Sequence, residues 1–197
     1  MTYTLSGVVS FQEEIRKSRF LVWAAPVRSA QHAAQFIAEH SDPAATHNCW
    51  AWKIGQAYRF NDDGEPGGTA GKPILQAIEG QSLDEVVVLV VRWFGGIKLG
   101  TGGLVRAYGG SAAQCLRQAE KTELVQLAEL TCRCAFSDMA LVQSRLAGFG
   151  ASVVSESFDE YGVTWQLSLP VDQVERFATE FANLTRGQGS LEGLPEP

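Results

Sequence analysis

The sequence has little of what marks secreted, membrane-spanning or metal-binding chains. It contains four cysteines and three histidines, without two Cys/His pairs at the spacing of a structural zinc site. No apolar stretch approaches the roughly 20 residues of a membrane span. Residues 1–10 lack the basic and apolar regions of a secretory signal. These absences predict a cytoplasmic protein with reduced thiols, without a membrane partner, a metal or another cofactor.

Positive charge is also scarce, and it is unevenly spread. The formal net charge is −6, which disfavours tight non-specific binding to nucleic acid. Residues 1–122 carry twelve Lys/Arg and eleven Asp/Glu, whereas residues 123–197 carry four and eleven. Only the first part could therefore offer an anion a positive surface, and sequence-specific DNA binding is not predicted. The asymmetry suggests two domains with different partners.

What is present in the first part is a mixture of strands and helices. Ser29 is a helix cap residue at the start of one amphipathic segment. The apolar run over 86–91 is typical of a strand buried on both faces, and it ends at Arg92 and Trp93. The predicted elements are strands over 3–11, 19–27, 48–54 and 86–91, and helices over 29–40, from about 69, and over 103–120.

The second part follows a clearer pattern, in the order strand, helix, strand, strand, helix, strand. The strands are predicted over 130–136, 153–158, 163–169 and 190–194. Asp138 is expected to cap the first helix, and Asp172 with Glu175 has capping-box spacing before the second. This order is that of the ferredoxin-like βαββαβ arrangement. We therefore predict an α+β chain with domains over 1–122 and 128–197.

Two Gly-rich segments invite comparison with nucleotide-binding motifs, and both fail it. In the first, Pro66 stands where a P-loop requires its first Gly, and Pro73 follows Lys72 where Ser or Thr is required. The second, after Trp93, has Val105 in the place of the last Gly of G-x-G-x-x-G. Neither ATP hydrolysis through a P-loop nor a dinucleotide site is predicted.

Basic residues beside these segments are candidates for contact with phosphate. Arg92, Lys98 and Arg106 surround a Gly-rich stretch that leads into a helix, a combination that suits phosphate or RNA backbone. An anion could also rest at the helix start near Lys72. The alternative is that the glycines allow close packing and the basic side chains are solvated. The glycines concerned are Gly95, Gly96, Gly100, Gly102 and Gly103.

Three carboxylates, Asp62, Asp63 and Glu65, form an acidic cluster in the first Gly-rich segment. They could bind a hard cation such as Mg²⁺, but we favour a solvated turn because Asp-Gly and Glu-Pro are typical turn sequences. Cys49 and His47 share a strand face, without a visible partner to orient the histidine. Most of the aromatic residues at alternating strand positions are expected to pack rather than to stack on bases.

Long motifs in the first part resemble those of the YigZ/IMPACT family. They are FNDDGEPGGTAGKP over 60–73, VVRWFGGIKLGTGGLVRAY over 90–108, the E-x-x-K-S-R-F segment over 14–20, and HNCW over 47–50. The resemblance covers the whole chain. It implies a first domain similar to the second domain of ribosomal protein S-five and a ferredoxin-like second domain. The pair is similar to consecutive domains of elongation factor G, and eukaryotic relatives look like regulators of translation.

Three functions are consistent with these observations. The first, which we favour, is a binding protein that contacts RNA, the ribosome or a translation-associated protein through the Gly-rich basic surface. The second is a metal-assisted enzyme, in which the acidic cluster holds the metal and Lys72, Arg92 and Lys98 hold a small phosphorylated substrate. A purely structural role through homodimerisation is the third.

Overall fold

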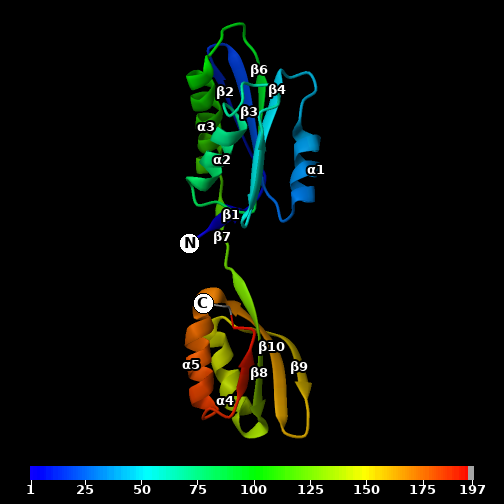
Figure 1. Cartoon of the computed structure of the whole chain (residues 1–197), viewed down its shortest axis with the longest axis vertical. Coiled ribbons are helices and arrows are strands. Elements are labelled where there is room, and N and C mark those ends of the chain that lie inside the picture. The colour runs from blue at the N-terminus through cyan, green and yellow to red at the C-terminus, as the bar shows by residue number, and fades with distance from the viewer. Residues whose placement is uncertain (195–197) are drawn as a thin grey trace. The chain divides into compact units, whose positions relative to one another are not determined.

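The structure is a computed structural model that describes residues 1–194 (Figure 1). The chain divides into two compact units, Met1–Leu124 and Val125–Pro197. Each unit combines an antiparallel sheet with helices, which confirms the predicted α+β class. Among the described residues, every helix is too short or too polar to span a bilayer.

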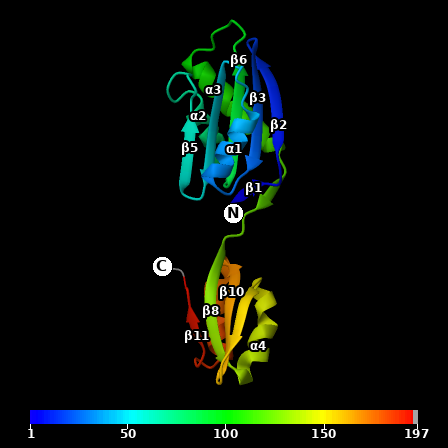
Figure 2. The ribbon, with the colours of Figure 1, turned by 90° about the vertical axis from the view of Figure 1, so that its right-hand side faces the viewer.

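The first unit is built on a five-stranded antiparallel sheet (Figure 2). Its strands follow the order β2 (Val9–Ile15), β3 (Ser18–Pro26), β6 (Val86–Trp93), β4 (His47–Ile54) and β5 (Ala57–Asn61). The predicted apolar strand is thus the central β6, which is buried from Val86 to Arg92 because helices cover both faces. A second, two-stranded sheet pairs β1 (Tyr3–Leu5) with β7 (Lys121–Glu123).

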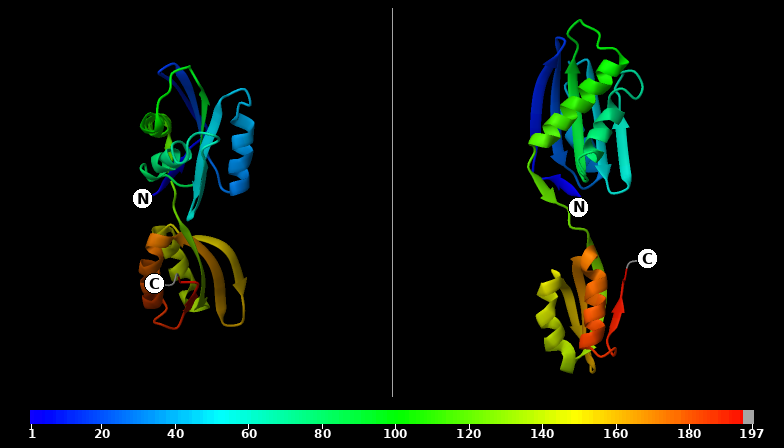
Figure 3. Two further views of the ribbon diagram at one scale, coloured as in Figure 1. Left: turned by 45° about the horizontal axis from the view of Figure 1, so that its top comes forward. Right: turned by 90° about the vertical axis from the view of Figure 1, so that its left-hand side faces the viewer.

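Helices α2 (Gly71–Glu79) and α3 (Thr101–Gln118) cover one face of this sheet, and α1 (Ala30–His40) covers the other (Figures 1 and 3). The larger core lies under α2 and α3, where Ile74, Ile78 and Leu116 pack against Phe20 and Val88. A smaller core lies under α1. The start of α3 and the loop before α2 therefore lie on the same side of the sheet.

The second unit has the predicted ferredoxin-like topology. Its sheet order is β11 (Ser190–Glu192), β8 (Leu127–Ala135), β10 (Gly162–Pro170) and β9 (Ser152–Phe158). Helices α4 (Phe136–Leu146) and α5 (Val174–Leu184) carry apolar residues into one core with the sheet. Trp165 and Phe177 are the largest fully buried side chains of that core.

One predicted helix cap is confirmed and two are wrong. The Ser29 side chain accepts a hydrogen bond from the backbone N–H of His32 at 3.1 Å. Helix α4, in contrast, begins at Phe136, so that Asp138 lies inside the first turn and makes no cap bond. A short 3-10 helix over Val171–Gln173 precedes α5, and the side chain of Asp172 does not cap it.

The predicted strand over 3–11 is interrupted. Its two halves, β1 and β2, pair with different partners, β7 and β3. Strand β5, which sequence patterns did not predict, has all five residues exposed at the edge of the sheet. Its residues do alternate, with Tyr58 and Phe60 beside polar Arg59 and Asn61, but this alternation spans only four residues and has no buried face.

Candidate functional site

A buried carboxylate, that of Glu65, joins three elements of the first unit. Its side chain is 4% exposed. One oxygen, Oε1, accepts hydrogen bonds from Arg92 Nη1 at 2.5 Å and from the Tyr108 hydroxyl at 2.6 Å. Arg92 comes from β6 and Tyr108 from α3. The loop before α2 is thus held by an ion pair, which offsets the cost of burying the two charges.

Two further side chains extend this network. Arg92 Nη2 donates to Ser18 Oγ at 3.2 Å, while Arg92 Nε is buried and has no hydrogen-bond partner among the described residues. His47 Nε2 lies 3.7 Å from Glu65 Oε1. The other ring nitrogen of His47, Nδ1, is 2.7 Å from the carbonyl oxygen of Asp63. A carbonyl only accepts, so Nδ1 carries a proton, and Nε2 is the nitrogen that faces the carboxylate.

Cys49 lies beside the network and is fully buried. Burial, only partly opposed by a contact with the Tyr108 hydroxyl, raises the pKa of the Cys49 thiol to about 12. Burial, together with Cys49 and Glu65, also raises the pKa of Tyr108, which keeps the phenol protonated. The weak possibility of a Cys49–His47 catalytic pair is therefore not supported, because nucleophilic cysteine is the thiolate.

The Asp62 carboxylate occupies the start of α2. Its oxygens accept from the backbone N–H groups of Gly68 at 2.8 Å, Ala70 at 3.0 Å and Gly71 at 2.8 Å. Burial opposes the charge of Asp62, but these three donors outweigh it and lower the pKa of the carboxyl. The chain thus supplies its own anion at this helix start, and an external anion near Lys72 would have to displace it.

The acidic cluster is dispersed rather than gathered. Asp63 Oδ2 accepts from the backbone N–H of Asn48 at 2.6 Å, and Glu65 is paired with Arg92. Within residues 1–194, no three His, Cys, Asp or Glu side chains converge as metal ligands. Lys72 is exposed on α2. The three carboxylates thus have separate partners, and Glu65 is buried rather than solvated as the turn interpretation expected.

Next to the Glu65–Arg92 pair there is a cavity of about 450 Å³, which we name the His47–Lys98 cavity. Lys98 and Gly100, both predicted as binding residues, line it, and so do buried Arg92 and Glu65. The remaining lining residues come from the start of β4, from the loops before β4, before α2 and after β6, and from the first turn of α3. They are Thr46, His47, Pro66, Phe94, Leu99, Thr101 and Leu104.

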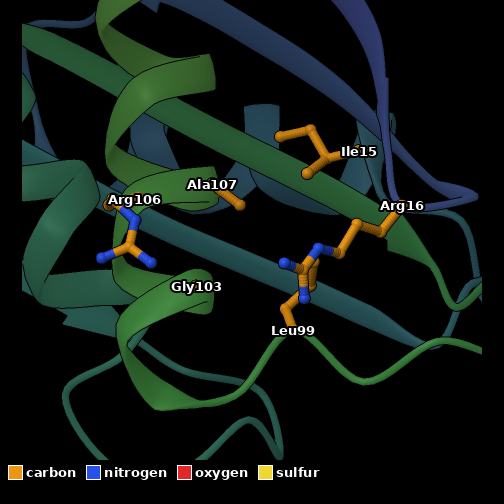
Figure 4. A pocket seen from close by; sticks show the side chains of 6 residues that line it. All are labelled: Ile15, Arg16, Leu99, Gly103, Arg106 and Ala107. Atoms are coloured by element: carbon orange, nitrogen blue, oxygen red, sulfur yellow. The ribbon is translucent and has the colours of Figure 1, made fainter.

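A second, smaller hollow of about 250 Å³ holds two arginines (Figure 4). Arg106 projects from α3 and Arg16 from the turn between β2 and β3, and their guanidinium groups lie on opposite sides of the hollow. Gly103 and three apolar residues complete the lining, which contains no carboxylate. Neither arginine forms an ion pair with another described residue.

The glycines bring this hairpin turn and the Gly-rich stretch together. A Cβ atom on Gly95 would lie 1.8 Å from the carbonyl oxygen of Lys17, so only glycine allows the approach. Gly100, which precedes α3, has a φ of 74°. Gly102 lies beneath Arg106, since a Cβ there would be 3.6 Å from Arg106 Nη1. Gly96 also has a positive φ.

The structure therefore separates the predicted basic residues. Arg92 is 4% exposed and paired, Lys98 lines the His47–Lys98 cavity, and Arg106 lines the other hollow. Arg16 was not among the predicted site residues. Its signal in the sequence is the pair of adjacent basic residues, Arg16 and Lys17, between two strands that face each other in a hairpin.

Family models and curated relatives both match most of the chain. The Impact N-terminal domain matches residues 16–116, and a domain of unknown function (DUF1949) matches residues 132–188. An IMPACT family member in the pol 5′ region of Thermus thermophilus is 47% identical over 180 residues, 91% of this chain and 99% of that protein. The IMPACT family member YigZ of Escherichia coli is 37% identical over 197 residues, 95% of each chain.

A solved structure agrees with these relatives. The crystal structure of a hypothetical protein is 36% identical, with a TM-score of 0.67, and the match covers 100% of this chain and 98% of that one. The family resemblance carried by the two Gly-rich motifs is thereby confirmed: the chain belongs to the IMPACT family.

Proposed function

We propose that this chain is an RNA-binding protein of the translation apparatus that contacts phosphates through Arg16, Lys17 and Arg106, which we call the basic surface. The observation that carries the proposal is the hollow between Arg16 and Arg106, where two guanidinium groups lie without a carboxylate partner among residues 1–194. Arginine in this arrangement suits bidentate contact with phosphate. Such a role would be exercised in the cytoplasm, on ribosomal RNA or another structured RNA.

Backbone strain at the same place supports the proposal. Arg16 and Lys17 have φ values of 47° and 67°, and Ile15 pairs directly with Ser18. Positive φ at both positions of a two-residue turn is normally met by Asn-Gly, because side chains such as those of Arg and Lys make it unfavourable. Unfavourable backbone of this kind concentrates at functional sites. The turn thus keeps two basic side chains where small residues would be more stable.

Co-sedimentation with separated ribosomal subunits over a salt series tests the proposal. The Arg16→Ala/Arg106→Ala variant is compared with Arg59→Ala/Arg117→Ala, which removes the same charge from exposed positions on β5 and the last turn of α3. We expect the affinity of the unaltered chain to fall steeply with salt. Each lost phosphate contact should reduce the slope of log K against log salt by roughly 1.

Two results would count against this function. Equal losses in the two double variants would show a general effect of net charge rather than a site. Absence of binding to both subunits at low salt, with the unaltered chain shown to be folded by circular dichroism, would exclude ribosomal RNA as the target. A translation-associated protein would then be the partner to seek.

A further inference from the structure

The His47–Lys98 cavity has the size and the mixed lining of a small-molecule site. Its volume of about 450 Å³ lies within the roughly 300–1,000 Å³ of known ligand pockets. One side is apolar, with Phe94, Leu99 and Leu104. Phe94 is 46% exposed although it is a large aromatic residue, and its backbone N–H is fixed by a hydrogen bond to Thr46 Oγ1 at 2.9 Å. The cavity therefore presents a positioned aromatic ring to a ligand.

The cavity lining also carries a positive charge. Lys98 forms no ion pair with another described residue. Thr101 begins α3, a helix of 18 residues whose cap position, Gly100, has no side chain to bond its first N–H groups. Unbonded N–H groups and the helix dipole favour an anion at such a start. Glu65 neutralises Arg92 but leaves the charge of Lys98 uncompensated.

Arg92 supplies the second, independent observation. Its side chain is 5% exposed and lines the cavity, yet its Nε is buried without a hydrogen-bond partner among the described residues. Buried donors are nearly always satisfied, by protein, water or ligand. The guanidinium carbon also lies 5.6 Å from the centre of the Phe94 ring. The Arg92 guanidinium thus lies next to the aromatic wall of the cavity, with Nη1 and Nη2 bonded to Glu65 and Ser18 and Nε shielded behind them.

We propose that the His47–Lys98 cavity binds a small molecule with one anionic group, a phosphate or a carboxylate, on a compact apolar body. The anionic group lies between Lys98 and the start of α3, and the apolar body lies against Phe94 and Leu104. This site adjoins the basic surface, because Leu99 lines both this cavity and the hollow between Arg16 and Arg106. Neither Arg16 nor Arg106 lines the cavity, so the proposal does not depend on RNA binding.

Phenyl phosphate is the probe, because it combines an anion with a ring. Its binding is measured by calorimetry and by the Arg Nε–H resonances of the ¹⁵N-labelled full chain. Phenylacetate replaces the phosphate of the probe with a carboxylate. Inorganic phosphate has the anion without the ring, and benzyl alcohol has the ring without the anion. We expect phenyl phosphate or phenylacetate to bind at least about tenfold more tightly than inorganic phosphate or benzyl alcohol. The Arg92 Nε–H resonance should shift on binding, and it is assigned by its loss in Arg92→Lys.

Matched variants locate the bound probe. Lys98→Met and Phe94→Ala should each weaken binding by about tenfold or more, whereas Lys72→Met removes an exposed charge of α2 and should leave it unchanged. Arg16→Ala/Arg106→Ala should also leave it unchanged. Loss of binding in that double variant would place the anion at the basic surface and overturn the proposal. Failure of both ring-bearing anions to bind at about 10 mM would overturn it as well.

Discussion

The Glu65 carboxylate links the loop before α2 to the sheet and to α3, so its charge matters for stability. Glu65→Gln leaves the Arg92 guanidinium, 5% exposed, without its counter-charge. We expect the free energy of unfolding in urea to fall by about 3 kcal/mol, because an uncompensated buried charge is strongly unfavourable. Glu79→Gln, at an exposed position of α2, should change it by less than about 0.5 kcal/mol.

A double-mutant cycle identifies the cause of that loss. Glu65→Gln/Arg92→Met removes both charges and should cost less than the sum of the two single variants, because no charge remains buried alone. Strict additivity would contradict the ion pair as the source of stability. The pair lines the His47–Lys98 cavity, so the same cycle measures the coupling energy that holds these two lining residues together.

At the turn formed by Arg16 and Lys17, a substitution is expected to raise the stability of the chain rather than lower it. Arg16→Asn/Lys17→Gly places residues that accept positive φ where φ is 47° and 67°. Stability in urea should rise by about 1–2 kcal/mol as the backbone strain is relieved. Ribosome co-sedimentation should weaken in the same variant, since two cationic side chains are lost. A variant that is more stable and binds equally well would contradict the role given to this turn.

At the scale of elements, the start of α2 depends on Asp62. Asp62→Ala removes the acceptor of three backbone N–H groups and should cost about 1–2 kcal/mol at pH 7. The folded state lowers the pKa of this carboxyl, so its contribution is present above the unfolded value of about 3.9. It is lost as pH falls through the lower folded value.

Urea unfolding at pH 7, 5 and 3 measures this dependence. The difference between the unaltered chain and Asp62→Ala should stay constant from pH 7 to pH 5 and become smaller at pH 3. Lys72→Ala, in the first turn of the same helix but exposed, is the control and should show no such change. A difference that persists undiminished in acid would mean that the charge of Asp62 is not what α2 requires.

Elements were predicted best where the pattern is set by burial. The run Val86–Val91 gave the central strand, and the alternation in the second part gave the ferredoxin-like order. Helix starts were less predictable, because a carboxylate also stabilises a first turn without capping it, as Asp138 does. Asp62, which does bond a helix start, lies nine residues before α2 begins. Local capping patterns do not reach that far.

The candidate site was also predicted incompletely, because its residues meet across long distances in the sequence. Arg92 was predicted as a phosphate contact from its neighbours in sequence, whereas its partner, Glu65, is 27 residues away. Because Arg92 continues a fully apolar strand, its burial could have been anticipated, and a buried arginine requires a counter-charge. Arg16 and Arg106 meet only through the packing of a hairpin on α3, a tertiary contact that no local spacing encodes.

At the scale of the whole molecule, the two units share one chemical property: every cysteine is free and buried. Burial raises the pKa of Cys49 and Cys115 in the first unit, and of Cys132 in the second, to about 12 in each case. Burial also raises the pKa of Cys134. None of the four is expected to be a thiolate at neutral pH while the chain is folded.

Alkaline pH should therefore destabilise both units. In the unfolded chain the thiols ionise at about pH 8.5, but the folded values are near 12 for three of them. The stability that these thiols contribute is complete below about pH 8.5 and is lost progressively up to about pH 12, because the unfolded state releases protons that the folded state retains. The urea midpoint should consequently be lower at about pH 9.5 than at pH 7.5.

Thiol reactivity separates this cause from other alkaline effects. With Ellman's reagent at pH 8, the four cysteines should react within the mixing time in guanidinium and only slowly in the folded chain. The rate in the folded chain should follow opening of the cores, so that urea well below the midpoint accelerates it. Rapid reaction of any one thiol without urea would show an accessible, ionisable cysteine. Any loss of stability of the two units at alkaline pH would then require another explanation.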